Sequence, residues 1–398
     1  MLSVSNLLCD HHAGNEALRY GHRRRDRQVA AHGNATARAP RPVVVWALTK
    51  ACNLKCVHCY ASAQRDPAAG ELTFEEGKAL LDDLRAFEVP GVLFSGGEPL
   101  VRRDALVLLE YARQIGLRCT LSTNGTLIDD AMAGRLVDLG LQYVGISVDG
   151  VRTRHDKLRG VAGCYDQTIA AIRHCRRRGL KVGVRFTVHA LNREDLDAIF
   201  DLCVEHDVNR LCIYHLAYAG RGGSMQRVDL TPTQTRKVVD QIFERTKQLH
   251  EAGCHLEVLT VGNHADAAYL VMQLEAIDPE RARRVHDLLA GTGGNRSGCN
   301  IASIDPMGNV HYDQFSWHYT CGNVREKPFS EIWATASDQR LRVLRDRRSA
   351  LPQRCQSCRF LDICNGNLRT RAESATGNWL GEDPSCYLNP AETMACAV

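Results

Sequence analysis

The chain has 398 residues, with 50 Lys and Arg against 46 Asp and Glu, and 44% of its residues are hydrophobic. This length can bury a full core without disulfide bonds, and it predicts two or three domains or one barrel with an appendage. The net charge of +4 excludes strong global attraction to nucleic acid or anionic membranes. No apolar run approaches the roughly 18 residues of a membrane span. We therefore expect neither a nucleic-acid nor a membrane partner.

The 17 cysteines are an odd number, which excludes full internal pairing. The first residues carry their charges after a short apolar stretch, unlike a secretory signal, so we expect a cytoplasmic protein. In that reducing compartment, clustered cysteines hold metal or do redox chemistry more often than they form disulfides. Six isolated cysteines fit apolar patterns and are interpreted as small hydrophobic residues: Cys119, Cys164, Cys175, Cys203, Cys212 and Cys254.

Residues 1–41 are basic with few apolar anchors, and we expect a mobile arm. Beyond them, six apolar runs alternate with amphipathic stretches, which indicates parallel strands joined by helical crossovers. The runs are nearly continuous in apolar residues, as in strands covered on both faces. The predicted fold is α/β, a partial (βα)6 barrel over residues 42–260. The predicted strands are 43–48, 91–94, 119–122, 143–148, 181–188 and 210–216, and the predicted helices begin at Thr73 and span about 103–115, 129–139, 165–178, 193–206 and 232–251.

Residues 261–298 are interpreted as a linker with helical content. Residues 299–398 change in style, with short strands near residues 303–313 and a dense group of cysteines. We expect this part to be a separate small domain built around metal. The barrel, in turn, should place its chemistry at the carboxyl ends of its strands, where the polar motifs collect.

The first cysteine group comprises Cys52, Cys56 and Cys59, within eight residues after the first predicted strand. Three soft ligands this close together suit zinc or an iron-sulfur cluster, and a four-iron cube needs a fourth ligand. Either a distant residue supplies that ligand, or one metal stays open for a substrate or cofactor. His58 lies inside the loop, but Cys59 beside it makes His58 a poor candidate ligand.

These three cysteines, followed by Tyr60 and by the SGGEP motif of residues 95–99, resemble the radical SAM superfamily. The resemblance implies a partial (βα)6 barrel whose open iron is chelated by S-adenosyl-L-methionine. It also implies that one electron from a 4Fe-4S cluster, delivered by a low-potential donor, splits the sulfonium. The resulting 5′-deoxyadenosyl radical abstracts hydrogen, while the protein supplies placement and shelter.

Further residues at strand ends fit a site for that cofactor. Gly96 and Gly97 lack side chains that would block a ligand, and Glu98 offers a carboxylate to the methionine ammonium. The stretch HDKLRG resembles one in related enzymes, where its arginine, here Arg159, meets the cofactor carboxylate. Plain turn chemistry is the alternative for Asn124-Gly125 and Asp149-Gly150. The expected cofactor contacts are completed by Tyr60, Ser122, Asn124, Ser147 and Asp149.

The second cysteine group comprises Cys355, Cys358, Cys364 and Cys386, enough to close a zinc site or a cluster. It resembles the SPASM and Twitch extensions of radical SAM enzymes, which hold auxiliary 4Fe-4S clusters. In full SPASM domains two more cysteines occur, at positions that correspond here to Leu368 and Asp313. We therefore expect one auxiliary cluster, two 4Fe-4S clusters in all, and interpret Cys299 and Cys321 as free thiols.

Longer stretches, including residues 214–222, 257–270 and 308–333, resemble the radical SAM proteins of heme d1 biosynthesis. This resemblance implies an iron tetrapyrrole substrate, 12,18-didecarboxysiroheme, from which two propionate side chains are removed. A flat ring rimmed by carboxylates calls for aromatic walls and arginine clamps. The candidate pocket residues are His215, Arg221, Trp317 and His318, with Phe315 and Tyr319 on the same face of a possible strand, and Arg325, Arg359, Arg369 and Arg371 near the mouth.

Other functions remain open at this stage. Another tetrapyrrole side-chain enzyme, such as a siroheme-pathway deacetylase or decarboxylase, and a peptide-modifying SPASM maturase share the same motifs. A non-catalytic iron-sulfur or zinc protein fits less well, because a closed site would need a fourth ligand beside the first three cysteines.

Overall fold

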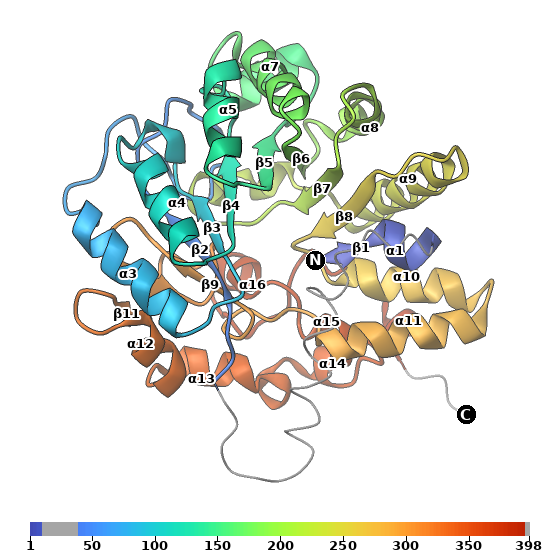
Figure 1. The fold of residues 1–398 in the computed structure, drawn as a ribbon. Helices are drawn as coiled ribbons and strands as arrows, with labels where there is room; N and C mark the ends of the chain where they lie inside the picture. Colours follow the sequence, from blue (N-terminus) through green and yellow to red (C-terminus); the bar gives the residue numbers. More distant parts are fainter. Residues whose placement is uncertain (10–38, 395–398) are drawn as a thin grey trace.

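The computed structural model describes residues 1–9 and 39–394. Its strands form one sheet in the order β1-β8-β7-β6-β5-β4-β3-β2-β9-β10-β11 (Figure 1). From β2 to β8 each strand pairs in parallel with the next along the chain. The strands are β1 Leu2–Ser3, β2 Val43–Ala47, β3 Val92–Ser95, β4 Cys119–Thr123, β5 Tyr143–Ser147, β6 Lys181–Val188, β7 Arg210–His215, β8 Glu257–Val261, β9 Ile301–Ile304, β10 Asn309–His311 and β11 Gly322–Asn323.

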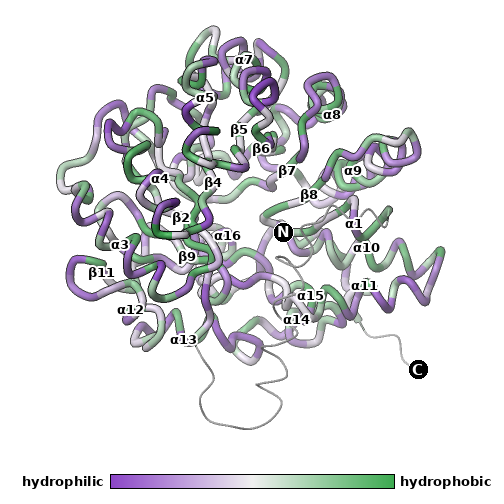
Figure 2. The backbone as a smooth tube through the Cα atoms, viewed as in Figure 1, coloured by the Kyte–Doolittle hydropathy of each residue, from purple (hydrophilic) through white to green (hydrophobic). Residues whose placement is uncertain are grey.

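The six predicted strands are confirmed as β2 to β7, and β8 adds a seventh parallel strand. Hydrophobic residues follow these central strands, whereas hydrophobic and hydrophilic residues alternate along the outer helices (Figure 2). The helix predicted at Thr73 begins there with a capping box to Glu76. The helices between the strands are α3 Phe74–Ala86, α4 Ala105–Gln114, α5 Asp130–Asp138, α6 Arg152–Arg159, α7 Cys164–Arg177, α8 Leu196–Glu205 and α9 Pro232–Glu251.

The first nine residues are part of the fold, so the expected mobile arm is wrong for them. β1 pairs antiparallel with β8, with Leu2 opposite Thr260. The next helix, α1 (Val4–Cys9), is buried over most of its length, with Val4 fully covered. Together they cover the exposed edge that β8 would otherwise leave. The rest of the predicted arm, residues 10–38, lies outside the described residues.

The C-terminal part continues the barrel sheet. β9 pairs in parallel with β2, so that Ala302 lies opposite Val44, and β10 returns antiparallel through a turn at Gly308. The segment predicted as a linker holds two helices that pack together, α10 Ala265–Glu275 and α11 Pro279–Thr292. The remaining helices are α12 Phe329–Thr335, α13 Gln339–Arg345, α14 Gln353–Gln356, α15 Leu361–Cys364, α16 Arg369–Thr376 and α17 Pro390–Thr393, with short 3-10 turns η2 Pro99–Val101, η3 Arg193–Asp195, η4 Gly220–Val228 and η5 Arg348–Ala350.

Within the described parts of the chain, no helix is both long and apolar enough to cross a membrane.

Docking of the N-terminal helix can be tested by truncating one of its buried side chains. Leu7 is 4% exposed, so Leu7→Ala should lower the free energy of unfolding by about 2–3 kcal/mol, through lost burial and the cavity left behind. Chemical denaturation measures this change. The matched variant Leu288→Ala, at a side chain that is 41% exposed, should change stability by less than about 0.5 kcal/mol. Equal, small effects for both variants would mean that α1 does not dock.

Candidate active site

The loops after β2 and β3 touch through their backbones. Gly97 N donates to Thr49 O at 2.8 Å, and Glu98 N donates to Ala51 O at 2.8 Å. A Cβ on Gly97 would lie 2.2 Å from Ala51 O, and one on Gly96, whose φ is +137°, would lie 2.7 Å from Thr49 O. The two glycines are therefore required by the approach to the cysteine loop itself. Sequence reasoning expected them to make room for a ligand.

Glu98 joins the loops after β3 and β4 through its buried carboxylate. It accepts hydrogen bonds from Thr123 Oγ1 at 2.8 Å, Asn124 N at 2.8 Å and Leu100 N at 3.1 Å. Burial raises the pKa of Glu98 to about 7, against the lowering effect of these three donors. The carboxylate thus positions the ends of β3 and β4. Its predicted contact with a methionine ammonium stays a prediction.

Each sulfur of the first cysteine group faces an N–H donor. Cys52 Sγ accepts from Leu54 N and Cys59 Sγ from Ala63 N, both at 3.4 Å. Arg159 Nη1 lies 3.4 Å from Cys56 Sγ. Burial raises the pKa of the Cys52 thiol to about 12, so metal binding would have to deprotonate it. Donors aimed at sulfur suit thiolate ligands of an iron-sulfur cluster, and these three residues could hold one.

Arg221 positions the cysteine loop from outside. Its Nε donates to Cys56 O at 2.8 Å and its Nη1 to Ala63 O at 2.6 Å. The neighbouring Gly220 has φ +54° and packs so closely that a Cβ would lie 2.3 Å from Tyr60 O. Arg221 was predicted as a substrate clamp, but its guanidinium is engaged by the loop backbone.

Asp149 forms a buried ion-pair centre beside the cysteine loop. Arg159 Nη2 lies 2.5 Å from Asp149 Oδ2, and His58 Nε2 lies 3.0 Å from the same oxygen. Burial alone would raise the pKa of Asp149, but Arg159 and His58 outweigh it and the pKa lies below its usual range. The side chain of His58 is thus engaged with Asp149. Arg159 links this centre to Cys56, and its expected contact with a cofactor carboxylate remains a prediction.

The structure brings the other predicted cofactor residues to the same end of the sheet. Ser122 Oγ accepts from Arg185 Nη1, and Ser147 ends β5 opposite Arg185 on β6. Asn124 Nδ2 donates to Asn53 Oδ1 at 2.8 Å within the cysteine loop. The sequence reasoning missed Arg185. Its signal was only one cation inside an apolar run, which gives no hint of its partners.

Tyr60 connects the cysteine loop to the C-terminal part. Its ring meets the edges of Phe315 and Trp317, with ring centroids 5.4 and 6.2 Å away. Its hydroxyl lies 3.3 Å from Ser95 Oγ. Trp317 also carries Lys50 Nζ over its ring, 4.8 Å from the centroid. Two of the three predicted aromatic residues therefore stand beside the first cysteine group.

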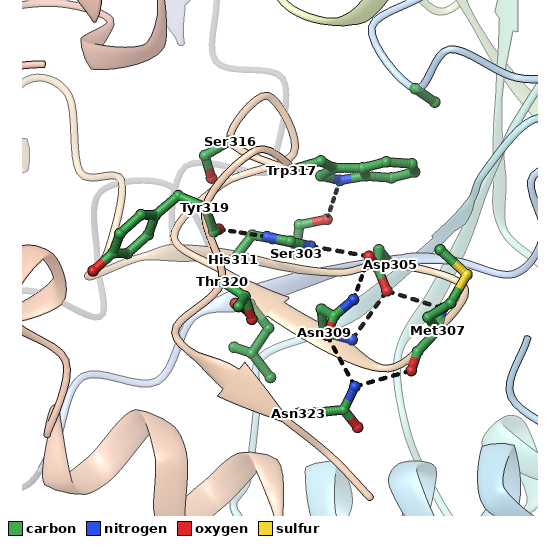
Figure 3. A network of polar contacts seen from close by, with 12 residues as sticks. Ser303, Asp305, Met307, Asn309, His311, Ser316, Trp317, Tyr319, Thr320 and Asn323 are labelled. Atoms are coloured by element: carbon green, nitrogen blue, oxygen red, sulfur yellow. Dashed lines mark hydrogen bonds and ion pairs between the residues drawn. The ribbon is translucent and has the colours of Figure 1, made fainter. Parts of the chain in front are cut away.

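The prediction that Phe315, Trp317 and Tyr319 lie on a strand is wrong. Residues 312–321 form a loop above the β9–β10 hairpin (Figure 3). Asp313 Oδ1 accepts from Phe315 N at 2.9 Å, a turn that breaks the extended pattern. Trp317 stacks on His311 and donates to Ser303 Oγ, whereas the Tyr319 ring points away from Trp317 (Figure 3). The Tyr319 hydroxyl donates to Asp338 Oδ2.

The predicted pocket histidines and most predicted arginines have partners within the fold. His215 Nε2 lies 2.9 Å from Asp266 Oδ2 in the core, and His318 Nε2 lies 2.8 Å from Glu373 Oε2 near the surface. Three of the arginines form ion pairs: Arg325 with Glu76, Arg359 with Glu275 and Arg371 with Asp383.

The second cysteine group surrounds one cavity. Cys355, Cys358, Cys364 and Cys386 all line it, together with apolar side chains such as Phe360. Within residues 1–9 and 39–394, no three potential ligands gather as they would around a single metal ion. Four thiols can close either a zinc site or an iron-sulfur cluster. A ring of thiols around a cavity is the arrangement that an iron-sulfur cluster requires.

Two buried arginines beside this cavity fit an anionic group there. Arg369 and Arg347 are 0% and 1% exposed, and Nε and one Nη of each have no hydrogen-bond partner. Burial and the neighbouring Arg369 lower the pKa of Arg347 to about 9. Cys355 and Cys364 act on Arg369, so their thiolates would supply the missing negative charge.

Comparison with known proteins agrees with this geometry. Residues 46–203 match the radical SAM superfamily, and residues 296–359 match SPASM, an iron-sulfur cluster-binding domain. The chain belongs to the radical SAM superfamily. It is 48% identical to the Fe-coproporphyrin III synthase of Methanosarcina barkeri over 395 aligned residues. The alignment covers 98% of each chain.

A second relative of this radical SAM enzyme is the pre-heme d1 synthase of Dinoroseobacter shibae, 42% identical over 89% of this chain and 88% of that protein. Among solved structures, Streptococcus suis SuiB bound to its precursor peptide SuiA superposes with a TM-score of 0.70 at 18% identity. It covers 92% of this chain and 80% of SuiB. That likeness confirms the fold.

The two cysteine groups predict separate losses of iron in the reconstituted radical SAM enzyme. The wild type should hold about eight irons, and Cys56→Ala or Cys358→Ala should each leave about four, since each cube takes four. Iron analysis measures the iron content of each variant, and electron paramagnetic resonance detects the clusters that remain. Cys299→Ala, at a thiol outside both groups, is the control and should keep about eight. Full iron content in Cys358→Ala would remove the auxiliary cluster from the account.

Proposed function

We propose that this radical SAM enzyme removes carboxylate-bearing side chains from an iron tetrapyrrole, 12,18-didecarboxysiroheme. The observation that carries the proposal is the chain-long similarity to two synthases whose names specify iron tetrapyrrole or heme products. The aromatic cluster of Tyr60, Phe315 and Trp317 beside the first cysteine group supports it. Aromatic rings suit the apolar faces of a tetrapyrrole.

Two versions of this reaction compete. The resemblance to heme d1 enzymes predicts removal of two propionates, as in a denitrification cofactor pathway. The Fe-coproporphyrin III synthase, however, has the higher identity, 48% against 42%, and matches more of the chain. Coproporphyrin keeps its propionates, so the similarity to the Fe-coproporphyrin III synthase favours removal of acetates, the deacetylase alternative. The higher identity makes acetate removal the first version to test.

The chain's residues prepare the site for this chemistry. Bound S-adenosylmethionine and the first cluster supply the 5′-deoxyadenosyl radical. Cys52, Cys56 and Cys59 hold that cluster, while Arg221 and the Gly96–Gly97 contact fix their loop. The four C-terminal cysteines hold a second 4Fe-4S cluster. A low-potential electron donor in the cytoplasm delivers the reducing electron.

A peptide-modifying role is the weaker alternative. The mycofactocin maturase MftC of Mycobacterium tuberculosis is 32% identical over 88% of this chain, lower than both tetrapyrrole synthases. The shared fold with a peptide-bound enzyme carries no substrate information.

The proposed reaction is tested by incubating the reconstituted enzyme with 12,18-didecarboxysiroheme, S-adenosylmethionine and dithionite under anaerobic conditions. Mass spectrometry should show stepwise loss of two side chains, and the fragment mass distinguishes acetate from propionate by one methylene. Cys56→Ala should abolish the loss, because the radical has no source. An unchanged tetrapyrrole mass with the active wild type would refute the proposed substrate.

A further inference from the structure

One arginine inside the barrel lacks an acidic partner. Arg185 lies on β6, and its Nη1 donates to Ser122 Oγ on β4, while its Nε has no hydrogen-bond partner. In the described chain no carboxylate forms an ion pair with it. Arginines on neighbouring elements do have such partners: Arg159 of α6 pairs with Asp149, Arg176 of α7 with Asp207 and Arg210 of β7 with Glu257. The charge of Arg185 is thus left for another group to balance.

The groups that act most strongly on Arg185 are phenols and a thiol, and none of them is a carboxylate. They are the phenols of Tyr214, Tyr143 and Tyr60 and the thiol of Cys212. Burial raises the pKa of Tyr214 and Tyr143 above the ordinary phenol value, so these two rings stay uncharged. A partly buried cation among neutral groups is unfavourable unless an anion joins it. A guanidinium presents its N–H groups in a fork that matches a carboxylate.

The backbone beneath Arg185 is shaped to let this side chain cross the sheet. Gly145 on β5 lies between Arg185 and Ser122, and a Cβ there would stand 2.4 Å from Arg185 Nε. The residues that directly follow Gly145 and Arg185, Ile146 and Phe186, are fully buried. Because successive side chains point to opposite faces, Arg185 lies on the other face of the sheet, which it shares with Ser122.

Tyr60 joins this cation to the aromatic cluster. It acts on Arg185 electrostatically, and its ring meets Phe315 and Trp317. An unpaired guanidinium and a set of aromatic edges are therefore linked through one residue of the cysteine loop. A flat apolar ring with carboxylates at its rim uses both features at once.

We propose that Arg185 binds a carboxylate of the iron tetrapyrrole and so positions the ring against Tyr60, Phe315 and Trp317. This inference rests on the proposed function and names the contact that recognises the substrate. The alternative source of a carboxylate is S-adenosylmethionine itself. Arg159, already expected to meet that cofactor, lies beside Cys56, whereas Arg185 lies on β6 and donates to Ser122 on β4.

The test uses the reconstituted enzyme and its Arg185→Gln and Arg185→Lys variants. Affinity for 12,18-didecarboxysiroheme is measured by absorbance titration without reductant, and affinity for S-adenosylmethionine by calorimetry. Arg185→Gln should weaken tetrapyrrole binding about tenfold or more, as expected for a lost charged hydrogen bond. Arg185→Lys should restore part of it. S-adenosylmethionine affinity, iron content and circular dichroism should stay unchanged.

Arg245→Gln provides the matched control, since Arg245 pairs with Asp201 on the outer helices, and it should bind both ligands as the wild type does. Weaker S-adenosylmethionine binding with normal tetrapyrrole binding in Arg185→Gln would assign Arg185 to the cofactor and overturn the inference. Unchanged binding of both ligands would also overturn it. If the wild type itself does not bind the tetrapyrrole, the proposed function fails, and the role of Arg185 falls with it.

Discussion

The backbone contact between Gly97 and Ala51 is the constraint on which the site depends. It places the SGGEP turn against the cysteine loop, with no room for even one methyl group between them. Because Glu98 follows directly, the same contact carries its carboxylate to the ends of β3 and β4. Cysteine placement and strand-end geometry are thus set by one close approach, which only glycine allows.

A second set of interactions secures the loop from the far side of the barrel. Arg159 reaches from α6 to both Asp149 and Cys56, and Arg221 reaches from η4 to the loop carbonyls. Both arginines brace the loop, while Nε of Arg159 and Nη2 of Arg221 have no hydrogen-bond partner. Rigid support of this kind is what a reactive intermediate requires, because a small displacement of the ligands changes where the radical forms.

The sequence predicts much of this site because its signals are local. The spacing of Cys52, Cys56 and Cys59, the SGGEP turn and the six apolar runs all depend on short-range chemistry. The fate of Arg221 and the isolation of Arg185 depend on tertiary partners that no local pattern encodes. The alternation of aromatic residues at Phe315 and Trp317 indicates a strand, but the side chain of Asp313 accepts from Phe315 N and stabilises a turn there instead. The N-terminal residues 1–9 were missed because their apolar pattern is short, and the edge of β8 that receives them is distant in sequence.

The central claim is that a radical generated at the first cluster acts on a side chain of an iron tetrapyrrole. Substrate deuterated in its acetate and propionate side chains tests this claim most directly, by mass spectrometry of the 5′-deoxyadenosine formed with the wild-type enzyme. The account predicts deuterium in 5′-deoxyadenosine, and substrate labelled in only one kind of side chain shows which kind is attacked. Tetrapyrrole product accompanied only by unlabelled 5′-deoxyadenosine would contradict it.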